Sequence, residues 1–200
     1  IEVRDTSRER ALEAQAAAFQ GMHEALPVFD RFRADSHVSR LNRDGILRDV
    51  PPSLATVLAA SSDLYQRSQG HFDITILPLL QASRHTLHRT GNPLRPEDIQ
   101  ELKGVIGFQH LHQDPKTVRL GRSGMQITLD GIAKGYIVDR AVDVLRTMGV
   151  ESALVNAGGD IRVLSGSQDM PWRIGIQDPE RKGRHLTRLG LRQAAVATSG

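Results

Sequence analysis

The segment from Ile127 to Tyr136 (ITLDGIAKGY) holds the residue types best suited to chemistry in this sequence. Its pattern predicts a strand, a glycine-containing turn and the start of a helix, where backbone amides favour a bound anion such as phosphate. Lys134 falls in the first helical turn, where its ammonium group could reach the same anion. Asp130 and the turn carbonyls are oxygen ligands suited to a hard cation such as Mg²⁺. The motif therefore indicates a nucleotide diphosphate bound with a metal, although an ordinary capped helix with a surface lysine gives the same pattern.

Two further segments leave a functional and a structural interpretation open. Asn156–Asp160 (NAGGD) is expected between two strands, and its paired glycines permit either close approach to a ligand or a plain tight turn. Asp73 and Thr75 alternate with apolar residues in the segment 72–80. They therefore either face a ligand or form the solvent side of a half-buried strand.

The spacing of histidines, serines and carboxylates does not define a complete metal or catalytic site. His110 and His112 are two apart on a predicted strand, and His85 and His88 are three apart in a predicted loop. Either pair could bind zinc, but the sequence places no third ligand, and we expect structural histidines. No serine lies in a nucleophile elbow and no paired carboxylates stand out as acid and base. The sequence names no catalytic residue.

The elements that must position these residues are helices early in the chain and strands late. Apolar residues at three- and four-residue steps predict a helix over 6–29, opened by the capping-box spacing of Thr6 and Glu9 and kinked or restarted at Pro27. Asp35 or Ser36 is expected to cap a short turn. Further helices are expected over 52–70, from 96 and over 132–149, an exposed loop over 84–96, and strands over 72–80, 108–112, 117–120, 125–129, 151–156, 161–164, 172–177, 185–191 and 194–198.

This order predicts a mixed α/β or α+β fold in one compact unit, with the two early helices packed on a later, mixed sheet. The 200 residues are 39% hydrophobic and 24% charged, which is typical of a globular chain. With 26 basic and 23 acidic residues, the charge is too even for a non-specific polyanion binder. Cysteine is absent from the sequence, which excludes disulfides, thiol nucleophiles and Cys-ligated metals. No apolar run is long enough for a membrane span.

Read in order, five blocks resemble the FAD:protein FMN transferase family, also called the ApbE family. The resemblance runs from about Ala11 to Gly200, and the order of the blocks makes chance similarity unlikely. The blocks are 32–42 (FRADSHVSRLN), 70–79 (GHFDITILPL), 129–136 (LDGIAKGY), the glycine pair of 155–160 with 171–179 (PWRIGIQDP), and 197–200 (ATSG).

The resemblance implies an enzyme that binds FAD as substrate and uses Mg²⁺ to cleave its pyrophosphate. The FMN half is joined to a Thr or Ser hydroxyl of a partner protein, and AMP is released. It also implies a bacterial protein that is periplasmic, or associated with the inner membrane and facing the periplasm. Family members begin with an earlier strand and continue past the 197–200 block, so the resemblance implies a single ApbE-like domain over 1–200 that lacks an N-terminal strand and a C-terminal metal and flavin part.

Motif positions assign expected roles. Phe32 takes the place of an aromatic residue that packs on FAD. The FAD-contacting positions are His71, Phe72, Asp73, Thr128 and Lys134. For the metal, the resemblance implies the backbone carbonyl of Gly131, and Asp130 is a further candidate.

Two departures from the family pattern matter. The family reads D-L-G-G-I-A-K-G where this chain has Thr128 first and Asp130 third, so a carboxylate has moved two residues. Leu77 stands where the family has glycine, and its side chain could narrow the flavin pocket. These changes keep two alternatives open: a relative that binds FAD without transferring FMN, and a structural protein that retains only the scaffold.

Overall fold

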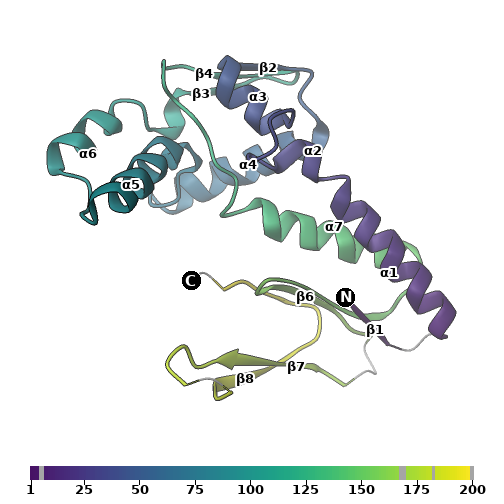
Figure 1. Cartoon of the computed structure of the whole chain (residues 1–200). Helices are drawn as coiled ribbons and strands as arrows, with labels where there is room; N and C mark the ends of the chain where they lie inside the picture. Colours follow the sequence, from purple (N-terminus) through teal and green to yellow (C-terminus); the bar gives the residue numbers. More distant parts are fainter. Residues whose placement is uncertain (5–6, 167–169, 182, 199–200) are drawn as a thin grey trace. The chain divides into compact units, whose positions relative to one another are not determined.

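The computed structural model describes residues 1–4, 7–166, 170–181 and 183–198. They form two compact units (Figure 1). Unit 1 comprises Ile1–Glu24 and Lys134–Gly200, and unit 2 comprises Ala25–Ala133. The described residues mix helices with antiparallel strands, so the predicted mixed fold class is confirmed.

Unit 1 is built on an antiparallel sheet with the strand order β1-β5-β6-β9. A separate hairpin is formed by β7 and β8, with a register shift between Ile176 and Gln177. The elements of the unit are β1 (Glu2–Arg4), α1 (Arg8–His23), α7 (Ala133–Thr147), β5 (Ser152–Ala157), β6 (Asp160–Leu164), β7 (Trp172–Gln177), β8 (His185–Leu191) and β9 (Ala195–Val196).

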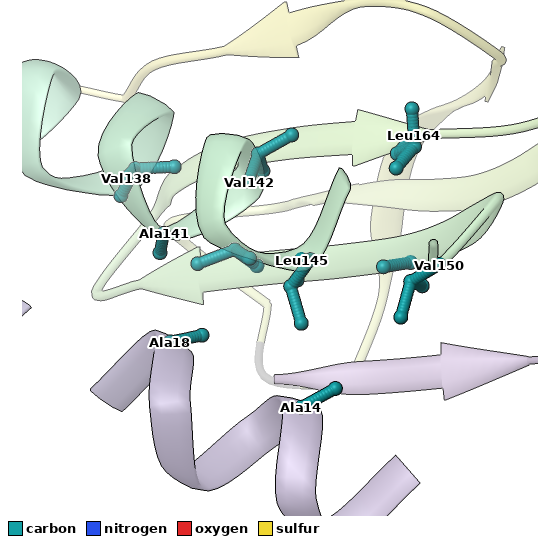
Figure 2. Packing of buried hydrophobic residues seen from close by; sticks show 10 residues of the cluster. Ala14, Ala18, Val138, Ala141, Val142, Leu145, Val150 and Leu164 are labelled. Carbon is teal, nitrogen blue, oxygen red and sulfur yellow. The ribbon is translucent and has the colours of Figure 1, made fainter. Parts of the chain in front are cut away.

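The core of unit 1 joins both of its helices to the sheet (Figure 2). Small side chains of α1 face the apolar side of α7, which allows the two helices to approach closely. Central sheet residues such as Val155 complete the cluster. Its buried members are Ala14, Ala18, Val138, Ala141, Val142, Leu145, Val150, Ala153, Val155 and Leu164.

The first helix starts one residue later than a cap at Thr6 would place it. Ser7 is the N-cap, and its Oγ accepts a hydrogen bond from the Arg10 amide at 3.3 Å. The predicted cap Thr6 lies outside the described residues. The predicted restart at Pro27 is confirmed, because α1 ends at His23 and a new helix contains Pro27 in its first turn.

Unit 2 combines helices with a three-stranded antiparallel sheet of order β2-β4-β3, on which α3 packs through β2 and β4. Its core includes Leu41, Leu47, Leu58 and Val118, all almost fully buried. The elements are α2 (Leu26–Phe29), α3 (His37–Asp44), β2 (Ile46–Arg48), α4 (Pro52–Arg67), the 3-10 helix η1 (Ile74–Ile76), α5 (Leu77–Thr90), α6 (Pro96–Lys103), the 3-10 helix η2 (Phe108–His110), β3 (Leu111–Gln113) and β4 (Thr117–Leu120).

The predicted strand over 72–80 is wrong, and the predicted loop over 84–96 is confirmed only for 91–95, because 84–90 belong to a helix. Asp73 caps η1, with its carboxylate accepting from the Thr75 amide, and Pro78 lies at the start of α5. Proline in the first turn is preorganised for a helix and needs no amide partner there. The helix continues to Thr90 and ends at Gly91, which is left-handed with φ of 72°.

The predicted strand over 125–129 is also absent from the described sheets. This segment is held by irregular partners: the backbone of Ile127 bonds to the Asn42 side chain, and the Thr128 amide bonds to the Ile74 carbonyl. Apolar residues alternate here because Met125, Ile127 and Leu129 are buried. Periodicity alone does not distinguish such a buried irregular segment from a strand.

Candidate functional site

The turn 128–132 of unit 2 has its own hydrogen bonds. The Thr128 hydroxyl accepts from the Asp130 amide at 3.2 Å. The Leu129 carbonyl accepts from the Ile132 and Ala133 amides at 3.0 and 2.7 Å. Asp130 and Gly131 are exposed, whereas Thr128 and Leu129 are buried. The turn thus presents its tip while its base is fixed in unit 2.

Asn42 anchors this turn, a role that its place in the first block did not reveal. Its Nδ2 donates to the Ile127 carbonyl at 2.9 Å, and its Oδ1 accepts from the Ile127 amide at 2.7 Å. The side chain therefore replaces the two bonds that a neighbouring strand would make. The sequence did contain a signal: polar residues recur every third position in this block, at Ser36, Ser39 and Asn42.

The two serines of that block also have local roles. Ser36 is buried and caps α3, accepting from the Ser39 amide at 3.1 Å, as one of the two predicted caps. The Ser39 hydroxyl donates to the Arg31 carbonyl at 3.0 Å. The other predicted cap, Asp35, accepts two hydrogen bonds from Arg33, which hold the pKa of the exposed Asp35 carboxyl below its usual value.

Asp130 is ion-paired with Arg31, a residue the sequence analysis did not single out. Arg31 Nε lies 2.8 Å from Asp130 Oδ2, and the Arg31 guanidinium lies over the Phe32 ring, 4.0 Å from its centroid. Phe32 is 78% exposed. The Phe32 amide donates to Asp30 Oδ1 at 2.9 Å, which fixes the backbone under this exposed ring.

The segment His71–Asp73 approaches the same turn through Phe72. A Cβ placed on Gly131 would lie 3.4 Å from Phe72 Cε2, so this turn position has little space for a side chain. The Phe72 amide donates to Ser68 Oγ at 2.9 Å, and His71 is exposed. The structure therefore brings two separate sequence blocks together at Gly131.

Asp73 and Thr75 do not lie on a strand, and both are hydrogen-bonded within unit 2. Asp73 Oδ1 accepts from the Thr75 amide and hydroxyl at 2.8 and 2.7 Å, and Oδ2 accepts from the Phe108 amide at 3.3 Å. The buried Thr75 hydroxyl accepts in turn from the Gly107 amide at 2.8 Å. Both side chains hold the chain entering η2, and Asp73 remains partly exposed.

Leu77, the second departure from the family pattern, is the first residue of α5 and is buried. Its φ of −54° is ordinary for a helix. The backbone here does not need glycine, and the leucine side chain contributes to the core of unit 2.

Lys134 belongs to unit 1, where it meets the glycine turn between β5 and β6. Its Nζ lies 3.3 Å from Asp160 Oδ2, and the Asp160 side chain is only 13% exposed. The Gly159 amide donates to Asn156 Oδ1 at 3.0 Å, and the Thr198 hydroxyl donates to the Gly159 carbonyl at 3.2 Å. Three blocks of the sequence thus meet in unit 1; Ser199 and Gly200, which complete the last block, lie outside the described residues.

The predicted histidine pairs are differently placed. His110 ends η2 while His112 lies in β3, and His85 and His88 lie on α5 rather than in a loop. In the described ranges, no three His, Cys, Asp or Glu side chains gather to hold a metal. The turn offers the Thr128 hydroxyl, the Asp130 carboxylate and backbone carbonyls, which are donors of the kind Mg²⁺ takes.

This chain is similar in fold to solved structures of ApbE proteins. The ApbE protein of Thermotoga maritima matches with a TM-score of 0.82 at 27% identity, covering 98% of this chain and 65% of that one. The apo form of the Pseudomonas stutzeri flavinyl transferase ApbE matches with a TM-score of 0.79 at 27% identity, covering 98% of this chain and 62% of that one. The fold is therefore that of the ApbE flavin transferases.

The relatives found by sequence similarity belong to the same family as these structures. A protein of Vibrio cholerae serotype O1 named FAD:protein FMN transferase is 30% identical over 181 residues, which cover 84% of this chain and 52% of the relative. A Klebsiella pneumoniae protein of the same name is 35% identical over 174 residues, covering 84% and 53%. The model of the ApbE family matches residues 1–200, and the chain belongs to the ApbE family. It spans about half the length of these curated relatives.

Proposed function

We propose that this chain is part of an FAD:protein FMN transferase. The observation that carries the proposal is the assembly around the turn 128–132: Asn42 holds its base, Arg31 bonds to Asp130, and Phe72 lies against Gly131. Asn42, Phe72, Asp130 and Gly131 come from three of the blocks through which the chain resembles the family, and Arg31 and Ile127 lie just outside those blocks. The exposed Phe32 ring beside a polar turn suits a ligand with both a flat ring and phosphates.

The proposed ligand is FAD, bound as substrate. Phe32 would pack on FAD, and His71, Phe72 and Asp73 form the segment proposed to contact it. Thr128 lies at the base of the turn, and Lys134 would offset the charge of a phosphate. All six roles follow from motif position.

The proposed reaction joins FMN to a partner protein with a Thr or Ser acceptor. The acceptor hydroxyl oxygen forms a bond to the phosphorus of the FMN half, the pyrophosphate P–O bond breaks, and AMP leaves with the bridging oxygen. The hydroxyl proton passes to solvent or to a base that the described residues do not identify.

Mg²⁺ is proposed to assist at the same turn. Bound there, it would lower the charge on the phosphate oxygens. The Gly131 carbonyl is the proposed contact of this chain; the Asp130 carboxylate is only a candidate, because its Oδ2 already bonds to Arg31. The described residues therefore supply a partial ligand set, which phosphate oxygens and water would extend.

The domain and the compartment belong to the same proposal. We propose that residues 1–200 form a single, incomplete ApbE-like domain. No described helix is both long and apolar enough to cross a bilayer. An envelope-facing bacterial location rests on the family resemblance and is tested by fractionating the natural host.

The test incubates the full-length protein with FAD, Mg²⁺ and an acceptor domain carrying its Thr or Ser. A mass gain on the acceptor equal to one FMN, with release of AMP, is the expected result. An acceptor with alanine at the modified position is the matched control. Bound flavin without a mass gain would instead establish the alternative, a relative that binds FAD without transferring FMN, which Thr128 at the family's aspartate position favours. If the protein neither bound flavin nor transferred FMN, the second alternative, a structural protein that retains only the scaffold, would be established.

A further inference from the structure

The exposed ring of Phe32 is fixed from several sides although it contacts little of the protein. The Ser39 hydroxyl holds the Arg31 carbonyl at 3.0 Å, and Asp30 holds the Phe32 amide at 2.9 Å. The preceding side chain, Arg31, lies against the ring and is only 12% exposed. A single exposed apolar side chain is ordinary on a protein surface, but here the anchored backbone and the guanidinium stacked on one face leave the rest of the ring open to a flat partner.

Asp130 fixes the guanidinium in this arrangement. Arg31 Nε donates to Asp130 Oδ2 at 2.8 Å, so the plane of the guanidinium is oriented by a carboxylate from 99 residues away in the sequence. The planar guanidinium of arginine stacks on aromatic faces, whereas the ammonium group of lysine does so less well. The pair therefore connects the turn 128–132 to the orientation of Phe32.

We propose that Arg31 and Asp130 are positioning residues that hold the Phe32 ring so that its open face receives the planar ring of FAD. The inference rests on the proposed function and deepens it: the carboxylate of Asp130 orients Arg31, and Arg31 covers one face of Phe32. Asp130 acts here through the guanidinium and not as a ligand of the metal.

The test measures FAD affinity by flavin fluorescence in the full-length protein, with Mg²⁺ and with EDTA. Asp130→Asn removes the charge at nearly constant shape, and we expect FAD to bind roughly three- to tenfold more weakly. Arg31→Lys should weaken binding to a similar degree, and Asp130→Glu should retain most of the affinity. Asp44→Asn, which removes the exposed Arg43–Asp44 pair of α3, is the matched control and should leave affinity unchanged.

A double-mutant cycle separates positioning from a direct contact. In a Phe32→Leu background, Asp130→Asn should change FAD affinity by less than about twofold, because the ring it orients is gone. A full effect of Asp130→Asn in that background would overturn the inference. So would an effect that appears only with Mg²⁺, which would make Asp130 a metal ligand.

An independent readout needs no FAD. The Arg31 Nε–H resonance should be sharp and protected in the unsubstituted protein and broadened in Asp130→Asn; equal signals in the two would overturn the ion pair and the inference with it. If the unsubstituted protein bound no FAD, the proposed function and this inference would both fall. If the unsubstituted protein bound FAD but the effects of Asp130→Asn and Phe32→Leu on FAD affinity were additive, only this inference would be overturned, and the proposed function would stand.

Discussion

Lys134 has two candidate partners for its ammonium group: the Asp160 carboxylate, 3.3 Å away in the structure, and a phosphate of FAD in the proposed function. We expect Lys134→Ala to weaken FAD binding roughly ten- to a hundredfold, because a charge-assisted hydrogen bond contributes about 1.5–3 kcal/mol. Its effect on the free energy of unfolding should stay below about 1 kcal/mol, since the lysine is exposed. Flavin fluorescence titration and thermal melting measure the two effects.

Lys116→Ala is the matched control, because Lys116 is also exposed and lies outside every motif block. Equal FAD affinity of Lys134→Ala and the unsubstituted protein would remove Lys134 from the site. A large drop in melting temperature with unchanged affinity would show that the Asp160 pair is its whole role.

Asn42 makes a second residue-scale prediction. Asn42→Ala removes both partners of the buried Ile127 backbone, and leaving a buried group unsatisfied costs about 1–3 kcal/mol. We expect a loss of about 2–4 kcal/mol in the free energy of unfolding by urea denaturation. FAD binding should also weaken, because the base of the turn is released. Asn92→Ala, in an exposed loop, should change stability by less than about 0.5 kcal/mol.

Among individual residues, those of the turn 128–132 could be predicted from the sequence, but the residues that hold this turn could not. Asp130, Gly131 and Lys134 stand out by type and spacing, because an acid, a glycine and a lysine at a helix start are suited to binding phosphate and a metal ion. Arg31 carries no such signal, and the polar spacing that includes Asn42 does not reveal what Asn42 bonds to. Their partners are 99 and 85 residues distant, and only the fold brings them together.

Among the elements, α6 offers a pH-dependent prediction. Arg95 donates two hydrogen bonds to Asp98, at 3.0 and 2.8 Å, and these lower the pKa of the Asp98 carboxyl. Because the folded-state pKa lies below the unfolded value, this pair stabilises the helix start above the unfolded pKa. The contribution is lost as pH falls through the folded pKa.

Arg95→Ala should therefore raise the pKa of Asp98, measured from the carboxyl carbon shift in an NMR titration. Lys103→Ala, at the other end of α6, is the control and should leave the titration of Asp98 unchanged. An unchanged Asp98 titration in Arg95→Ala would contradict the assignment of the shift to Arg95.

The long helices were predictable because their apolar residues repeat at helical spacing and their ends carry recognisable residues. The α4 helix starts at Pro52, and α7 ends shortly before the left-handed Gly149. The segment 72–90 was misread because Asp73 and Thr75 alternate like strand residues. In the structure they bond to each other and to the chain at Gly107, a distant contact that alternation cannot reveal.

For the whole molecule, the proposed single domain predicts one unfolding transition. Leu145 is fully buried in the core of unit 1, and Leu145→Ala should cost about 2–5 kcal/mol. If residues 1–200 form one domain, hydrogen exchange should show loss of protection in both units together. Loss confined to 1–24 and 134–200, with an intact transition for 25–133, would show two independently folding parts. Leu186→Ala, at an exposed position, is the control.

The two neighbouring glycines after β5 have different surroundings. A Cβ at Gly158 would have nothing within 4 Å, whereas a Cβ at Gly159 would collide with the Thr198 hydroxyl. Both have positive φ, 65° and 98°. We therefore expect the two positions to tolerate substitution unequally. Asparagine, which tolerates the left-handed region, is an acceptable replacement at 158, whereas any side chain at 159 must displace the Thr198 side chain. Deep mutational scanning would find a tolerant position directly before an intolerant one.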